Sequence, residues 1–231
     1  MADAAQRRRV FYGRRHGRRL RPARAALLAR NLESLSIDLS KASGSLPDLF
    51  TPPAAETWLE IGFGGGEHLA AQAQARPDIG FIGCEPFMNG VARLMSEIEA
   101  KDIGNIRLHA DDARDLLDVL PGASISRCFI MFPDPWPKVR HHNRRMVSTQ
   151  NLNALARVLS DGAELRMASD HMEYIRWMLF HVLRHDAFEW QCDGPADWRD
   201  RPADGTPTRY EQKALSQGDA CVYLRFRRRN R

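Results

Sequence analysis

The chain has 231 residues, of which 43% are hydrophobic and 27% are charged, and these values exclude a wholly disordered protein. No apolar run approaches the roughly 20 residues that span a bilayer, and the basic N-terminal tract has no apolar core of a secretion signal. The four cysteines lie far apart without a Cys-x-x-Cys pair, which argues against a zinc site or a disulfide framework. We therefore expect a reduced, cytoplasmic protein without a metal or a membrane contact.

The net charge of +5 is distributed unevenly along the chain. Residues 1–30 contain ten arginines and one acid, whereas the rest of the chain is slightly acidic. Two further basic clusters lie at residues 138–145 and among the last seven residues. An acidic body with basic patches is typical of proteins that bind polyanions, although terminal arginines are also often no more than solvated tails.

Apolar periodicity is almost absent from residues 7–24, which indicates a flexible basic arm, and a short helix is expected over residues 25–39. From Thr57 onward, apolar runs of strand length alternate with segments of helical periodicity. The predicted strands are Trp58–Ile61, Phe81–Cys84, Ile106–Leu108, Ile125–Phe132 and Ala163–Ala168. The predicted helices are Glu67–Arg76, Phe87–Lys101, Arg114–Leu120, Arg144–Leu159 and Met172–His185.

This alternation predicts an α/β fold with a mostly parallel, doubly wound sheet that is covered by helices on both faces. Gly162 is expected to end the helix predicted over Arg144–Leu159. Two late strands, Phe188–Cys192 and Cys221–Phe226, flank a polar loop, and one of them is expected to be antiparallel. Loops of this length are unusual unless they bind something. We expect residues 1–50 to form the arm with its short helix and residues 51–231 to form one domain.

A glycine-rich segment follows the first strand. Gly62 and Gly64 let the backbone turn sharply and approach a ligand, so both are predicted to contact a cofactor. Glu85 ends the second strand, where an acid can bind ribose hydroxyls. The spacing is GxGxG, and Glu67 stands where a dinucleotide-binding loop has its third glycine and would repel a pyrophosphate. With Glu60 beside the loop, these acids favour a cationic sulfonium cofactor over NAD, and a turn that serves packing alone is the other interpretation.

Acidic residues also follow the third and fifth strands. Asp111 and Asp112 lie at the carboxyl edge of the sheet, where one can accept a hydrogen bond from adenine or cap the helix that follows. Asp170 can accept hydrogen bonds from a base edge or cap its own helix. After the long loop, the segment Thr208–Glu211 adds a hydroxyl and an acid, although Glu211 is equally a first-turn helix acid.

The fourth strand runs into Phe132–Arg145, in which three prolines within five positions make a stiff turn. Such a turn can hold the Asp134 carboxylate toward a cofactor and an incoming base. Trp136 offers a stacking plane for a base, with core packing as the alternative. The next eight residues supply four permanent cations and two histidines, which suit a phosphate backbone.

Together these segments resemble the bacterial tRNA (guanine-N(7)-)-methyltransferase family. The matching segments are LEIGFGGG (Leu59–Gly66), the Glu85 strand end, Asp112-Ala113, FPDPWPKxRHxxRR (Phe132–Arg145), Ala168-Ser169-Asp170, TRYE (Thr208–Glu211) and the arm around Arg14–Arg19. The FPDPW motif with its basic cluster is highly specific, whereas the glycine loop is not. Two departures are small: His142-Asn143 stands where one basic residue is usual, and Arg209 stands where Lys is frequent.

The resemblance implies a Rossmann-like class I fold and methyl transfer from S-adenosylmethionine to ring nitrogen 7 of a tRNA variable-loop guanosine, at position 46. It implies cofactor contacts for Glu60, Gly62, Gly64, Glu85, Asp112 and Asp134, with Asp134 also catalytic. It implies guanosine contacts for Lys138, Asp170, Thr208, Arg209, Tyr210 and Glu211. It implies RNA contacts for Arg140, His141, His142, Asn143, Arg144 and Arg145. No metal and no obligate protein partner are expected.

Three other functions are weighed against this one. A methyltransferase for exocyclic amino groups would favour Asn/Asp-Pro-Pro-aromatic, whereas the order here is Pro-Asp-Pro-Trp. The glycine spacing and Glu67 count against a nicotinamide oxidoreductase. In a non-catalytic RNA-binding module, the acids at four strand ends would have no use. Binding of S-adenosylmethionine against NAD in equilibrium dialysis separates the oxidoreductase from the others.

Overall fold

The computed structural model describes residues 10–231, so Arg7, Arg8 and Arg9 of the expected arm lie outside the described residues. Its centre is a sheet in the order β3-β2-β1-β4-β5-β7-β6. The strands are β1 (Glu56–Ile61), β2 (Ile79–Cys84), β3 (Ile106–His109), β4 (Ile125–Met131), β5 (Leu159–Ser169), β6 (Phe188–Trp190) and β7 (Val222–Arg228). Strands β1 to β5 run parallel, whereas β7 runs antiparallel to both β5 and β6. The predicted α/β sheet is confirmed.

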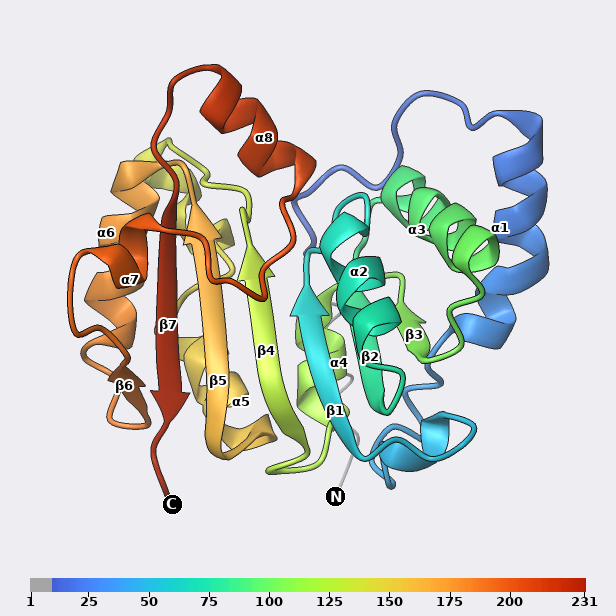
Figure 1. Cartoon of the computed structure of the whole chain (residues 1–231), viewed down its shortest axis with the longest axis horizontal. Coiled ribbons are helices and arrows are strands. Elements are labelled where there is room, and N and C mark those ends of the chain that lie inside the picture. The colour runs from blue at the N-terminus through green and yellow to red at the C-terminus, as the bar shows by residue number, and fades with distance from the viewer. Residues whose placement is uncertain (1–9) are drawn as a thin grey trace.

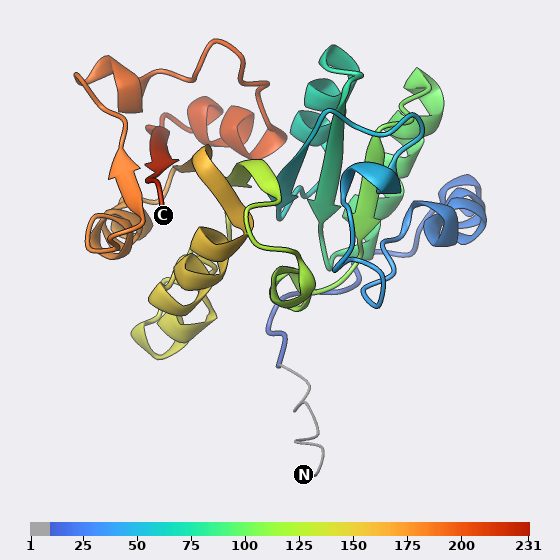
Figure 2. The same cartoon turned by 90° about the horizontal axis from the view of Figure 1, so that it is seen from below.

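Helices cover both faces of the sheet (Figure 1). They are α1 (Pro22–Leu35), α2 (Glu67–Ala75), α3 (Met88–Lys101), α4 (Ala113–Val119), α5 (Thr149–Val158), α6 (Met172–Val182), α7 (Ala196–Arg199) and α8 (Arg209–Ser216), with 3₁₀ turns η1 (Pro47–Leu49) and η2 (Val139–Arg144). Figure 2 shows α1, α2 and α3 on one side of the strands and α4, α5 and α6 on the other. The central strands are buried on both faces, which explains why β2 reads as a continuous apolar run rather than as an alternation.

Two separate cores follow from this layering. Leu59, Ile82 and Leu165 belong to the core beneath α4, α5 and α6, whereas Trp58 and Phe81 belong to the core beneath α1, α2 and α3. Neighbouring strand residues therefore face opposite cores, as the period of two in a strand requires. Helix α1 packs against α3, so the helix expected next to the arm belongs to this second layer. The domain boundary expected near residue 50 stays a prediction.

The helix predicted over Arg144–Leu159 is wrong at both ends. It begins at Thr149, where the Ser148 hydroxyl caps it by accepting a hydrogen bond from the Asn151 amide, and a 3₁₀ turn precedes it. The chain passes directly from α5 into β5 at Leu159, and Gly162 lies inside that strand with a φ of 78°. The register of β4 against β5 shifts there, so Gly162 serves an irregularity of the strand instead of stopping the helix.

The described part of the expected arm is docked on the protein. The Arg15 carbonyl accepts a hydrogen bond from the Met88 amide, and the Asn89 side chain bonds the backbone at Gly17 and Arg18. Residues Pro22 to Arg24, which the sequence assigned to the arm, are the first turn of α1. Residues 10–18 therefore run along the N-terminus of α3, on the edge of the sheet where β1 and β2 end (Figure 1). Within residues 10–231, no helix has the length and apolar character that crossing a bilayer requires.

Candidate functional site

A cleft of about 930 Å³ opens at the carboxyl ends of β1, β2, β4 and β5. Strand order reverses at β1, which pairs with β2 on one side and β4 on the other, so this edge is the place where open α/β sheets bind ligands. Each segment that carries the family resemblance contributes at least one residue to this cleft. Its walls include Gly62, Gly64, Glu85, Asp112, Asp134, Trp136, Asn143, Arg144, Asp170 and Tyr210.

The glycine loop joins β1 to α2 through a backbone that few other residues adopt. Gly62 and Gly64 have φ values of 76° and 56°, in the left-handed region. A Cβ on Gly90, in α3, would lie 2.0 Å from the Gly64 carbonyl oxygen, so the loop and the helix are in direct backbone contact. The loop therefore packs against α3 on one side and lines the cleft on the other.

Glu85, at the end of β2, accepts two backbone hydrogen bonds. Its Oε2 lies 2.6 Å from the Gly64 nitrogen, and its Oε1 lies 2.9 Å from the Phe87 nitrogen. Burial raises the pKa of this carboxyl to about 7, against the opposing effect of the two amide hydrogen bonds. Glu85 thus joins the glycine loop to the second strand and presents a carboxylate beside it.

Cofactor affinity should depend on pH through Glu85. Because its pKa lies near 7, acidification from about pH 8 to about pH 6 converts most of the carboxylate to the acid, which accepts ribose hydroxyl hydrogen bonds less well. The Kd for S-adenosylmethionine, measured by equilibrium dialysis, should rise across this interval. In Glu85→Gln, binding should be weak at both pH values and the pH dependence should disappear. A wild-type Kd that does not change with pH would contradict the predicted contact between Glu85 and the ribose.

Glu60 is buried and is not among the residues that line the cleft. It is 2% exposed, and its Oε2 lies 2.8 Å from Nδ1 of His68, which is equally buried. The Nε2 atom of His68 is buried without a hydrogen-bond partner among the described residues, and the ring meets Phe129 edge-on. The sequence missed His68, because a histidine in the first turn of a helix carries no pattern of its own. Direct contact between Glu60 and the cofactor stays a prediction.

The two aspartates after β3 have separate roles. Asp112 caps α4 by accepting a hydrogen bond from the Arg114 amide, and it also pairs with the Arg114 guanidinium. Asp111 accepts a 2.5 Å hydrogen bond from Nη2 of Arg15, in the arm. The capping role considered for this pair is therefore present, and both side chains still line the cleft.

The PDPW turn is held in an unusual backbone conformation. Phe132 and Trp136 both have left-handed φ values, 50° and 42°, and they bracket Asp134 between its two prolines. Non-glycine residues rarely adopt this conformation, and such strain is frequent at functional sites. Removal of water from around Asp134 raises the pKa of its carboxyl. Among residues 10–231, no side chain or amide donates a hydrogen bond to this carboxylate, so it is available to a ligand.

The basic cluster after this turn is divided between solvent and interior. Lys138 and Arg140 are exposed, and the Arg144 guanidinium lies between the rings of Tyr12 and Trp136, 4.3 and 4.9 Å from their centroids. Trp136 thus forms a wall of the cleft and is not part of either core, so core packing is the wrong alternative for it. Asn143 lines the same wall.

Arg145 corrects the prediction of an RNA contact. It is 2% exposed, donates to the Pro135 carbonyl at 2.8 Å and pairs with Glu173, and its guanidinium lies over Tyr174 and Trp177. With most of its donors used inside the protein, it fixes the PDPW turn from below, and its burial argues against a phosphate contact. The two histidines have ring contacts instead: His141 meets Trp136 and His142 meets Trp177, edge-on.

A further wall of the cleft comes from the end of β5 and from α8. Asp170 lines the cleft, and the helix after it is capped by the His171 side chain, so the capping alternative for Asp170 is wrong. Tyr210 is 49% exposed, and one of its ring carbons lies 3.2 Å from the position of a Cβ on Gly64. The side chain of Arg209 lies at the same end, 3.9 Å from Glu67.

Glu211 and Thr208 support this wall from inside. They form a capping box in which the Thr208 hydroxyl accepts from the Glu211 amide and the Glu211 carboxylate accepts from the Thr208 amide. The same carboxylate, 1% exposed, accepts hydrogen bonds from the Tyr223 hydroxyl at 2.5 Å and Arg201 at 2.9 Å. The interpretation of Glu211 as a first-turn helix acid is therefore confirmed, and its burial argues against direct contact with a substrate.

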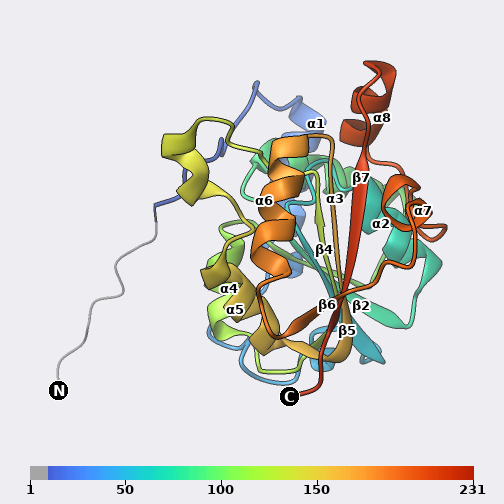
Figure 3. The same cartoon turned by 90° about the vertical axis from the view of Figure 1, so that its left-hand side faces the viewer.

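Two of the three basic patches face the cleft, and the third does not. Phe11, Tyr12 and Arg14 of the arm line the cleft, which the sequence could not indicate because it gives no docking position for an aperiodic segment. The C-terminal arginines lie at the opposite edge of the sheet, where β7 ends (Figure 3). Arg231 donates hydrogen bonds to carbonyls at the end of α5 and pairs with Asp161. Arg231 therefore stabilises the C-terminal end of α5.

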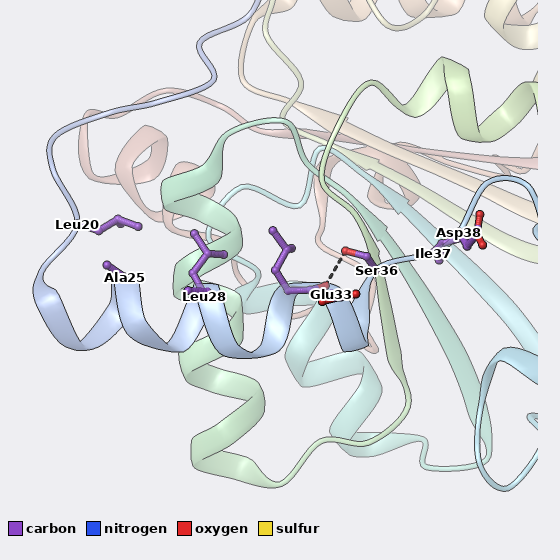
Figure 4. A pocket seen from close by; sticks show the side chains of 9 residues that line it. Leu20, Ala25, Leu28, Glu33, Ser36, Ile37 and Asp38 are labelled. Carbon is purple, nitrogen blue, oxygen red and sulfur yellow. Dashed lines mark hydrogen bonds between the residues drawn. The ribbon is translucent and has the colours of Figure 1, made fainter.

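A second, shallower cavity of about 680 Å³ runs along α1. Figure 4 shows Leu20, Ala25 and Leu28 toward one end of it and Ser36, Ile37 and Asp38 toward the other, beyond Glu33. Its walls are mostly apolar and lack the convergent acids of the first cleft. We therefore assign chemistry to the cleft at the strand ends.

The large cleft fits a sulfonium cofactor. Acids that include Glu85, Asp112 and Asp134 line it, and the glycine loop offers backbone close to a ligand. Acidic walls favour a cationic group and disfavour a diphosphate. The sheet order and the cleft therefore define a Rossmann-like, S-adenosylmethionine-dependent class I methyltransferase.

Comparison with known proteins agrees with this class. Residues 54–224 match the model of a family described as putative methyltransferases. The chain is 51% identical over 225 residues to a tRNA (guanine-N(7)-)-methyltransferase of Rhodospirillum rubrum, covering 96% of this chain and 88% of the relative. It is 48% identical over 235 residues to the enzyme of that name from Ruegeria pomeroyi, covering 96% and 95%. The chain belongs to the tRNA (guanine-N(7)-)-methyltransferase family.

Solved structures share the fold at low sequence identity. The 16S rRNA methyltransferase KamB superposes with a TM-score of 0.56 at 14% identity, covering 76% of this chain and 89% of that one. An rRNA methylase from Streptococcus thermophilus gives a TM-score of 0.52 at 12% identity, covering 81% and 94%. These likenesses confirm the predicted methyltransferase fold.

Proposed function

We propose that the protein transfers a methyl group from S-adenosylmethionine to ring nitrogen 7 of the guanosine at position 46, in the variable loop of tRNA. The observation that carries this proposal is Asp134, a carboxylate without a hydrogen-bond donor among residues 10–231, held on a strained turn between the glycine loop and a basic surface. The relatives that are about half identical over nearly the whole chain support the same substrate. On this proposal the enzyme acts in the cytoplasm, without a metal or an obligate protein partner.

The cofactor side of the cleft is the side of Glu85 and the glycine loop. When bound, S-adenosylmethionine supplies an electrophilic methyl group. Glu85 would hold the ribose and Asp112 the adenine, since both carboxylates lie at neighbouring strand ends beside Gly62 and Gly64. Their negative charge stabilises a cationic ligand in the cleft.

The guanosine side needs alignment more than proton transfer. Nitrogen 7 carries an in-plane lone pair and no proton, so no general base has to remove one. Asp134 and Asp170, which follow the neighbouring strands β4 and β5, can hold the amino and imino edge of the base and stabilise the positive charge that develops on the purine. Tyr210, beside Gly64, and Lys138 are further predicted guanosine contacts.

The RNA backbone is expected to lie along the basic rim. Arg140 and Arg144 from the η2 turn and the arm arginines supply cations there. Because the described arm crosses beside the cleft, one polynucleotide can contact both groups at once. Phosphate contacts of this kind fix position and make affinity depend on salt.

The assay that tests the function uses labelled S-adenosylmethionine and unmodified tRNA transcripts, followed by chain scission specific for 7-methylguanosine. Scission is expected after position 46. A matched transcript with adenosine at that position should take up no label. Label incorporated at another atom or another nucleotide would reject the proposal.

Removing the exposed arginines of the arm should weaken tRNA binding in a salt-dependent way. In Arg14→Ala/Arg18→Ala/Arg19→Ala, the slope of log affinity against log salt should fall by about one for each lost phosphate contact. Arg229→Ala is the matched control, because Arg229 is exposed at the opposite edge of the sheet. An unchanged slope in the triple variant, or an equal loss in the control, would remove the arm from RNA binding.

A further inference from the structure

A long segment between β6 and α8 crosses one face of the sheet before it reaches the cleft. Figure 1 shows it passing from α7 in front of β5 and β4 and then rising to α8. It is attached to the sheet at Asp204, four residues before Thr208. The helix that begins there carries the tyrosine that faces the glycine loop.

Asp204 joins this segment to three elements. Its Oδ1 accepts a 2.8 Å hydrogen bond from Arg166 on β5, and its Oδ2 accepts a 3.1 Å hydrogen bond from Arg127 on β4. Its carbonyl accepts a 2.6 Å hydrogen bond from the Gln72 side chain on α2. Arg76, the residue after α2, has its Nη2 atom 3.9 Å from Oδ2. No other residue in the crossing segment has ion pairs with this many arginines within residues 10–231.

The arginines that bind Asp204 are also held in place by other contacts. The Arg127 and Arg76 guanidinium groups lie over the Trp58 ring, 4.3 and 5.1 Å from its centroid, and the Arg166 side chain is 3% exposed. Burial raises the pKa of Asp204, but hydrogen bonds from Arg166 and the charges of Arg166 and Arg127 lower it further, so the net pKa lies below its ordinary value. The contact is therefore ionic at neutral pH, and its acceptors meet a rigid set of donors.

The connection from Asp204 to the cleft is short and stiff. Pro202 and Pro207 flank it, and the Gly205 amide closes a turn onto the Pro202 carbonyl at 2.8 Å. Beyond Pro207, the chain enters α8 at its capped N-terminus. A displacement of Asp204 should therefore also displace Tyr210.

We propose that Asp204 is a positioning residue for the guanosine side of the cleft. It fixes the N-terminus of α8, and with it Tyr210, against Gly64, without itself touching the substrate. This inference rests on the proposed function. It assigns a role to the charged face of β4 and β5, whose arginines pair with Glu164 and Asp204 and are not part of the basic rim.

The test measures turnover and binding separately. In Asp204→Ala, kcat for tRNA methylation should fall on the order of tenfold, because a small misplacement of aligned groups lowers the rate steeply. The Kd for tRNA and the Kd and stoichiometry for S-adenosylmethionine should stay unchanged, because the basic rim and the glycine loop are intact. Asp204→Glu, which keeps the charge, should recover most of the turnover. Asp200→Ala, in the same segment, is the matched control and should resemble the wild type.

Each other outcome has a definite meaning. Unchanged kcat in Asp204→Ala, or an equal loss in Asp200→Ala, would overturn the proposal. A lower cofactor stoichiometry together with a lower Tm would also overturn it, since the residue would then serve overall stability. A wild-type enzyme that binds the cofactor but methylates no tRNA would instead reject the proposed function, which this assay therefore distinguishes.

Discussion

Asp134→Ala should lower kcat for tRNA methylation by about a hundredfold or more, since it removes the fixed charge that faces the developing purine cation. Binding of tRNA should survive, because its affinity comes mainly from phosphate contacts on the basic rim. Single-turnover methyl transfer and tRNA binding, measured on the same preparation, separate the two. Unchanged turnover would remove Asp134 from the mechanism.

Two further measurements test whether the charge of Asp134 is what matters. Asp134→Asn keeps the shape and one acceptor oxygen but removes the charge, so it should retain more activity than the alanine variant and less than the wild type. Burial raises the pKa of Asp134, so the carboxylate is lost at a higher pH than for an ordinary aspartate as the solution is acidified. Wild-type kcat should fall on acidification, and the decline contributed by this group should be absent in Asp134→Asn.

Arg145→Ala should destabilise the protein by about 2–4 kcal/mol, whereas Arg140→Ala should leave its stability unchanged. Arg145 is buried and holds the Pro135 and Trp136 carbonyls and Glu173, so its removal leaves two half-buried carbonyls unpaired and a space beneath the PDPW turn. Arg140 is exposed, and its loss should weaken tRNA binding and reduce the salt dependence instead.

The measurement is thermal unfolding combined with tRNA binding at two salt concentrations. Arg145→Lys serves as a further control, because a lysine keeps the charge but lacks the forked guanidinium that bonds the two carbonyls and Glu173 at the same time. It should be nearly as unstable as the alanine variant. Equal stability of Arg145→Ala and the wild type would restore the RNA contact for this arginine.

The neighbours Arg144 and Arg145 show where sequence reasoning reaches its limit. Both belong to one basic run, and nothing in their type or spacing distinguishes them. The end of the η2 turn rotates one toward Tyr12 and Trp136 at the surface and the other under the turn. The direction is set by tertiary packing, which local sequence does not encode.

The strand ends, in contrast, were predictable. Buried parallel strands need continuous apolar runs, so the polar residue after each run marks the carboxyl edge of the sheet. Glu85, Asp112, Asp134 and Asp170 are therefore assigned to one cleft by the sequence pattern alone. Contacts between distant segments could not be predicted in this way: Arg15 meets Asp111 across 96 positions, and no periodic pattern relates the two.

Gly162 shows a different limit. A glycine after an apolar helical stripe is ordinarily a stop signal, yet here the helix ends at Val158 and the glycine lies in the next strand. A left-handed residue suits a strand irregularity as well as a helix end, so the same residue type fits both sites.

The cleft takes its walls from Phe11 near one end of the chain and from Tyr210 near the other. A nascent chain on the ribosome therefore cannot complete this cleft until the segment of α8 has emerged. Premature termination anywhere before that helix should yield protein with no partial activity.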